Sequence, residues 1–243
     1  MRTMRSRKLY QLAAVIAAAA LLKLFYSTAN VNELRWVLAP TSFCVELVTG
    51  ETFRFESYAG YMSSDHRFLI AASCAGVNFL ITAFLMLGLR ALLSDRSRAL
   101  SWRFIPLDAA LAYIVTIIVN TLRICVALWL RQLPDDIRSL SGSQLHRVEG
   151  IIIYFGFLLV LFVLTEQNGS EKAPGFQRKI GFAPAVYYSM TLIIPLLNGG
   201  YHYRGFFEHF IFVLVLPLIM AGLLVALRTL VTRVRSVPAR SVG

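Results

Sequence analysis

Charged residues are scarce in this chain. Only 15% of its 243 residues are Asp, Glu, Lys or Arg, whereas 57% are hydrophobic. Soluble globular domains carry about 25% charged residues, so this composition excludes an ordinary soluble domain. The apolar residues form long stretches that suit a nonpolar solvent, and the sequence therefore predicts an integral membrane protein that lies in a lipid bilayer.

Acidic residues are the scarcer of the two charge types. The chain has 13 Asp and Glu against 24 Lys and Arg, which gives a formal net charge of +11. Such a surplus can indicate a protein that binds nucleic acid. Here the basic residues lie in short segments between apolar stretches, where they orient helices in a membrane. We therefore expect no nucleic-acid partner.

Cysteine is also scarce, and the patterns of common metal sites are absent. The three cysteines, Cys44, Cys74 and Cys125, cannot all pair with one another, and there is neither a CxxC nor an HExxH pattern. A Cys44–Cys74 disulfide stays open as an alternative that would exclude a free thiol at Cys74. His146 and Glu149 have a spacing that can present two metal ligands, so a metal-dependent hydrolase is another alternative. We expect neither a metal nor a cofactor.

Apolar stretches close to the length of a membrane span recur along the whole chain. A span takes about 20 residues, and helices are favoured because they satisfy their own backbone hydrogen bonds in lipid. The six stretches cover residues 9–26, 71–93, 104–130, 145–165, 182–197 and 206–227. No small-residue cleavage site follows the first stretch, so we interpret it as a retained span. We predict an all-α polytopic transmembrane helical bundle of about six spans, forming a single membrane domain over residues 1–243.

The segment between the first two spans has a different pattern. Residues 36–49 are apolar but short for a span, and they contain Pro40, which favours a short re-entrant or interfacial helix. Aromatic and charged residues alternate over residues 53–56, and residues 67–70 have an extended character. These two patterns predict a small hairpin on the outer side.

The basic residues predict how the spans are oriented. With the N-terminus in the cytoplasm, the basic residues of two later loops and of the C-terminal tail also lie on the cytoplasmic side. These residues are Arg96, Arg98, Arg103, Lys172, Arg178, Lys179, Arg228, Arg233, Arg235 and Arg240. Both termini are therefore expected in the cytoplasm.

Three polar residues near the ends of these stretches then lie on the outer face. Cys74 opens the second span, Arg123 lies about two turns before the end of the third, and His146 begins the fourth. A helix N-terminus and a neighbouring cation both favour a thiolate. An imidazole exchanges protons near neutral pH. Together the three residues have the chemistry of a cysteine acyl-transfer site.

Each of these residues also has a simpler interpretation. Cys74 can be a small packing residue, Arg123 can extend to the membrane interface, and His146 can rest among the lipid headgroups. Asn120 lies one turn before Arg123 and can orient it by a hydrogen bond. A non-enzymatic transporter or assembly scaffold, with a polar site on its outer face, is the main alternative to an enzyme.

The order of these residues resembles that of the exosortase and archaeosortase family of membrane cysteine proteases and transpeptidases. Residues 73–76, Ser-Cys-Ala-Gly, resemble the family's Ala-Cys-Ser-Gly segment, although Ala75 stands where many members have Ser. Residues 120–124, Asn-Thr-Leu-Arg-Ile, resemble its Asn-x-x-Arg-Ile segment, and residues 146–150, His-Arg-Val-Glu-Gly, its His-x-x-x-Gly segment. The resemblance covers a core of residues 37–164 and is greatest to type K exosortases. The two additional C-terminal spans, within residues 182–227, match no motif.

The resemblance implies that Cys74, Arg123 and His146 are catalytic and that Gly76 and Asn120 support them. The substrate would be the C-terminal sorting signal of an exported protein, which consists of a Pro-Glu-Pro-like motif, a transmembrane helix and a basic tail. Cys74 would attack a backbone carbonyl near the motif and form an acyl-thioester, Arg123 would stabilise the thiolate or oxyanion, and His146 would protonate the leaving amine. The enzyme would lie in a bacterial inner membrane with its site on the periplasmic face.

Overall fold

The computed structural model describes residues 2–93, 101–132, 142–166, 181–197, 202 and 206–236. These residues are mainly helical, which confirms the prediction of an all-α polytopic bundle. The chain divides into two compact units, Met1–Tyr154 and Phe155–Gly243. The boundary between the two units falls inside one helix, and it also lies inside the predicted core of residues 37–164. That all of residues 1–243 form a single membrane domain stays a prediction.

Five described helices are long and apolar enough to cross a membrane. They are α1 (Arg2–Thr28), α3 (Val77–Leu93) together with the short 3-10 helix η1 (Ala72–Cys74) before it, α4 (Phe104–Arg131), α5 (Gly142–Glu166) and α9 (Phe206–Ser236). These helices account for five of the six predicted spans, and the chain is a membrane protein.

The sixth predicted span is helical but short. It consists of α7 (Phe182–Tyr188), a π-helical turn η4 (Ser189–Ile193) and α8 (Ile194–Leu197). At about 1.5 Å per residue, its 16 residues reach roughly 24 Å, less than the roughly 30 Å of a hydrocarbon core. The length of this segment therefore sets it apart from the five other spans.

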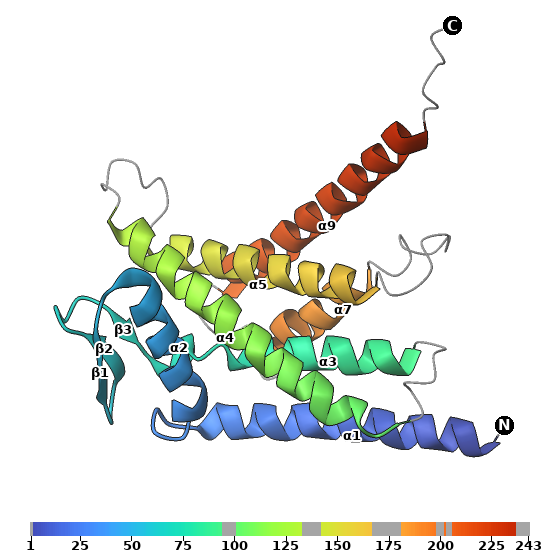
Figure 1. Ribbon diagram of the computed structural model, residues 1–243, viewed down its shortest axis with the longest axis horizontal. Helices are drawn as coiled ribbons and strands as arrows, with labels where there is room; N and C mark the ends of the chain where they lie inside the picture. The colour runs from blue at the N-terminus through green and yellow to red at the C-terminus, as the bar shows by residue number, and fades with distance from the viewer. Residues whose placement is uncertain are drawn as a thin grey trace, which may run out of the picture. The chain divides into compact units, whose positions relative to one another are not determined.

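Helix α3 is the centre of the first unit. It packs against both α1 and α4 (Figure 1). Gly88 permits the close approach to α1, because a Cβ atom there would lie 3.0 Å from Cγ1 of Val15. The C-terminal ends of α1 and α4 and the N-terminal end of α3 lie at the same end of this unit (Figure 1). The antiparallel course of these helices brings residues near 28, 74 and 131 to one end.

Helix α2 (Arg35–Thr49) is the short helix predicted around Pro40. Proline has no N–H, so the carbonyl four residues earlier loses its helical donor. That carbonyl belongs to Trp36, and the hydroxyl of Tyr113 donates to it at 2.7 Å while the two rings stack at 5.7 Å. Helix α4 therefore satisfies the backbone group that the proline leaves, and α2 packs on α4.

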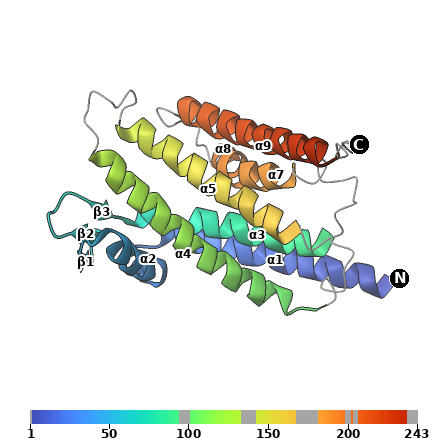
Figure 2. The same cartoon turned by 45° about the horizontal axis from the view of Figure 1, so that its top comes forward.

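The segment between α2 and α3 forms a three-stranded sheet where the sequence predicts a small hairpin. The strands β1 (Phe53–Glu56), β2 (Gly60–Ser63) and β3 (Leu69–Ile70) are antiparallel in the order β1-β2-β3, beside α2 (Figure 2). Strand β2 pairs with both predicted strands, with Glu56 opposite Gly60 and Tyr61 opposite Ile70. Sequence reasoning missed β2 because its four residues do not alternate between apolar and polar.

The second unit is built around α9. Helix α7 and the turn η4 pack against it, and the hydroxyl of Tyr188 donates to the carbonyl of Leu214 at 2.8 Å. The C-terminal part of α5 and α9 line a groove of about 440 Å³. Every lining residue is apolar: Gly156, Leu159, Val160, Val163, Leu164, Met220, Leu223, Leu224 and Leu227.

Candidate functional site

Cys74 ends the short helix η1, directly after β3 and three residues before α3 begins. Its backbone N–H donates to the carbonyl of Ala71 at 2.8 Å, and its side chain is half-buried. All three cysteines are free thiols: Cys44, Cys74 and Cys125. The structure therefore does not contain the alternative Cys44–Cys74 disulfide. The thiol of Cys74 thus lies at the start of a span, on the turn that leads into it.

Gly76 lets the turn approach α4 closely. Its φ angle is +71°, in the left-handed region that glycine adopts without strain. A Cβ atom at this position would lie 3.1 Å from Cγ of Asn120. Both the backbone angle and the space therefore require glycine, and this contact gives a physical reason for its predicted supporting role.

Asn120 joins this turn to the helices. Its side chain is fully buried on α4, its Nδ2 donates to the carbonyl of Cys74 at 2.7 Å, and its Oδ1 accepts from the hydroxyl of Tyr154 at 2.8 Å. A carbonyl only accepts, so the amide orientation is set by Cys74. The sequence predicts that Asn120 orients Arg123 by hydrogen bonding. In the structure the hydroxyl of Tyr154, on α5, links the two side chains, because it accepts from Arg123 and donates to Asn120.

Arg123 is directed into the first unit rather than toward the membrane interface. Only 7% of its surface is exposed, and its Nη1 donates to the hydroxyl of Tyr154 at 3.1 Å. Its guanidinium carbon lies 5.3 Å from the centre of the Tyr154 ring. A Cβ atom on Gly150 would lie 3.4 Å from Nε of Arg123. The side chain thus packs against one face of α5.

Charged and polar groups surround the guanidinium of Arg123. It interacts electrostatically with the thiol of Cys74 and with the carboxyl of Glu149, which is itself only 7% exposed. A charge within a span costs about 2.5–3.5 kcal/mol on insertion scales, and an opposite charge nearby offsets this cost. The sequence offered Glu149 as a metal ligand, and in the structure it is a buried residue of α5 whose carboxyl interacts electrostatically with Arg123.

Tyr154 is the residue of this site that sequence reasoning missed. It lies inside an apolar stretch, where a tyrosine is easily taken for a packing residue. The available signal was its helical spacing: Tyr154 follows Gly150 by four residues, so the two share one face of α5. The motif that contains Gly150 therefore indicated which side of the helix faces the site.

His146 lies on α5, one turn before Gly150. Its side chain is outside the described residues, and its closeness to Cys74 and Arg123 stays a prediction. Within the part of the chain that the structure describes, no group of three or more His, Cys, Asp and Glu is arranged to hold a metal ion.

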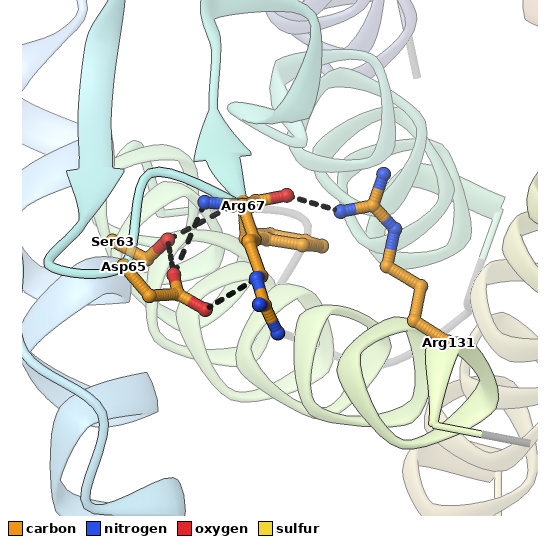
Figure 3. A network of polar contacts seen from close by, with 5 residues as sticks. Ser63, Asp65, Arg67 and Arg131 are labelled. Carbon is orange, nitrogen blue, oxygen red and sulfur yellow. Dashed lines mark hydrogen bonds and ion pairs between the residues drawn. The ribbon is translucent and has the colours of Figure 1, made fainter.

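A second set of contacts holds the three-stranded sheet on α4 (Figure 3). Arg131 donates from Nη1 to the carbonyl of Arg67 at 2.6 Å, and its guanidinium lies over the ring of Phe68 at 5.2 Å. Asp65 accepts from the hydroxyl of Ser63 at 2.6 Å and from the backbone N–H of Arg67 at 3.1 Å. Two hydrogen bonds from α4 therefore hold the segment that leads to Cys74. Arg131 donates to the carbonyl of Arg67, and Asn120 donates to the carbonyl of Cys74.

The fold and the site together define a polytopic helical membrane protein with a buried polar cluster beside a half-buried thiol. Comparisons of the chain with models of protein families, with curated proteins and with solved structures find no match.

Proposed function

We propose that this protein is an exosortase-like membrane cysteine protease or transpeptidase that cleaves C-terminal sorting signals of exported proteins. One observation carries the proposal: the buried guanidinium of Arg123 interacts electrostatically with the thiol of Cys74 and is linked by hydrogen bonds to the backbone of the same cysteine. A cation held beside a thiol favours the nucleophilic thiolate.

The reaction begins with attack of the Cys74 thiolate on the carbonyl carbon of the scissile peptide bond. The carbonyl electrons move to oxygen and give a tetrahedral oxyanion. Arg123 stabilises this negative charge, because a guanidinium stays protonated in proteins and acts through its field. When the oxyanion collapses, the C–N bond breaks, and His146 donates a proton to the leaving amine. The product is an acyl-thioester on Cys74, which water or an amine acceptor then resolves.

The position of the thiol supports a substrate that is itself anchored in the membrane. Cys74 stands at the start of the candidate span Ala72–Leu92. A substrate helix in the same bilayer brings the residues just outside the hydrocarbon core to that depth. Depth in the membrane thus selects the scissile bond. In this proposal the enzyme lies in a bacterial inner membrane, with both termini in the cytoplasm and the thiol on the periplasmic face.

The test uses a secreted reporter that ends in a Pro-Glu-Pro motif, a transmembrane helix and a basic tail. It is co-expressed with the full chain and with the variants Cys74→Ala and Arg123→Ala, and processing is followed by the loss of the C-terminal segment. We expect no processing with Cys74→Ala and a fall of about 10²–10³-fold with Arg123→Ala, the usual effect of removing a charge-stabilising group. The control is Tyr188→Phe in the second unit.

Other outcomes support the alternatives. Full function of Cys74→Ala together with loss of function in Arg123→Ala would contradict the protease and support a transporter or scaffold with a polar site. Loss of processing on treatment with a chelator, with zinc present in the purified protein, would support a metal-dependent hydrolase.

A further inference from the structure

The hydroxyl of Tyr154 is the meeting point of the polar contacts around Cys74. It receives a hydrogen bond from Nη1 of Arg123 at 3.1 Å and donates one to Oδ1 of Asn120 at 2.8 Å. Asn120 in turn donates to the carbonyl of Cys74 at 2.7 Å. Three consecutive hydrogen bonds thus lead from the guanidinium to the backbone of the predicted nucleophile.

The donor direction along these three bonds is determined by chemistry. The guanidinium only donates, and the carbonyl of Cys74 only accepts. The amide of Asn120 must therefore turn its NH₂ group to Cys74 and its oxygen to Tyr154. The hydroxyl of Tyr154 then uses its one hydrogen toward Asn120 and a lone pair toward Arg123. Hydrogen bonds that all run in one direction polarise and strengthen one another.

Packing holds the ring of Tyr154 in place. It stacks on Phe79 of α3, with ring centres 5.1 Å apart and an interplanar angle of 19°. Phe79 is buried and follows Cys74 by five residues. The ring also lies against the guanidinium of Arg123. Residues from α3, α4 and α5 therefore meet at this one side chain.

We propose that Tyr154 is a positioning residue that holds the Arg123 guanidinium beside the Cys74 thiol and couples both, through Asn120, to the backbone of the catalytic turn. This inference rests on the proposed function, since positioning matters to the rate only if Arg123 acts on Cys74. A group held about 1 Å from its productive place can lose roughly 10²-fold in rate, so an arginine with a long flexible stem needs such a support.

The test is Tyr154→Phe in the full-length protein, with Cys44 and Cys125 replaced by Ser. The substitution keeps the ring, its stacking on Phe79 and its contact with Arg123, and removes only the hydroxyl. The measurement is the pH dependence of Cys74 labelling by a maleimide in membranes without substrate. Besides Arg123, the titratable groups that interact with the thiol are Tyr26 of α1 and Tyr154 of α5, and Glu149 of α5 interacts with Arg123. Tyr26 and Glu149 are unchanged in the variant.

We expect the pH midpoint of labelling to rise in Tyr154→Phe and reporter processing to fall by about 10- to 100-fold. The matched control is Tyr113→Phe. Its hydroxyl also donates to a neighbouring element, at the Trp36 carbonyl, and its ring is also stacked, but it has no part in the contacts around Cys74. This control should leave both the midpoint and the processing unchanged.

A double variant separates this inference from the proposed function. If Tyr154 acts through Arg123, then Tyr154→Phe adds nothing in an Arg123→Ala background. An unchanged midpoint in Tyr154→Phe, with a raised midpoint in Arg123→Ala, would overturn the positioning role and leave the protease intact. Unchanged midpoints in both would overturn the proposed function itself. If Tyr154→Phe does not accumulate in membranes, Asn120→Ala removes the same link at Cys74 without adding a charge and must raise the midpoint instead.

Discussion

The two compact units differ in what they bury. Among the described residues, every buried Asn, Gln, Ser, Thr or charged side chain belongs to Met1–Tyr154, including Asn120, Arg123 and Glu149, whereas the described buried residues of Phe155–Gly243 are apolar or aromatic. Burying polar groups in a membrane protein costs free energy unless they are paired. The described part of the first unit carries this cost, and three of its buried polar residues, Asn120, Arg123 and Glu149, belong to the cluster beside Cys74.

Two glycines provide the strongest test of this difference. Gly76→Ala forces a Cβ atom onto a residue with φ of +71° and 3.1 Å from Asn120. Strain of this kind costs about 1–3 kcal/mol, and we expect thermal unfolding in detergent at a lower temperature together with loss of processing. The control is Gly222→Ala on α9, where a Cβ atom meets nothing within 4 Å. Equal effects of the two substitutions would remove the distinction between the units.

A smaller effect is expected where the sheet meets α4. Arg131→Ala removes the hydrogen bond to the carbonyl of Arg67 and the contact with the Phe68 ring. A bond of this kind contributes about 1 kcal/mol, so chymotryptic cleavage after Phe68 should become about fivefold faster. Arg54→Ala, an exposed position on β1, is the control. If Arg54→Ala accelerates the cleavage as much as Arg131→Ala, α4 does not hold the turn.

The smallest expected effect is a pH dependence of the same turn. Hydrogen bonds from Ser63 and from the backbone N–H of Arg67 hold the pKa of Asp65 below its usual range. The unfolded turn therefore binds a proton at higher pH than the folded turn does. The stabilisation by Asp65 is complete above about pH 4, the usual pKa of an aspartate, and is lost as the pH falls through the lower folded-state value.

Hydrogen exchange of amides 63–68 measures this loss. Protection in the parent should fall at acidic pH, whereas Asp65→Asn, which lacks the titrating group, should show weaker protection with no such step. A matching step in the Asp65→Asn variant would assign the pH dependence to another group.

Local patterns predicted much of the first unit. The spans follow from length and apolarity, and the short helix around Pro40 follows from an apolar run too short to cross a bilayer. Gly76 and Asn120 were selected through their motifs, and the structure adds the contact between them. Strand β2 was not predicted, because its four residues do not alternate between apolar and polar. Tyr154 was not predicted as a site residue, because its hydrogen-bond partners lie on another helix.

The sequence by itself determined that the chain is a helical membrane protein, because hydrophobicity and helical hydrogen bonding act within each segment. It also determined which polar residues stand near the ends of spans. Only the tertiary structure decided that Asn120 joins Cys74 to Tyr154, since these hydrogen bonds link residues 46 and 34 positions apart. Such contacts depend on how α3, α4 and α5 pack, and no single segment contains that information.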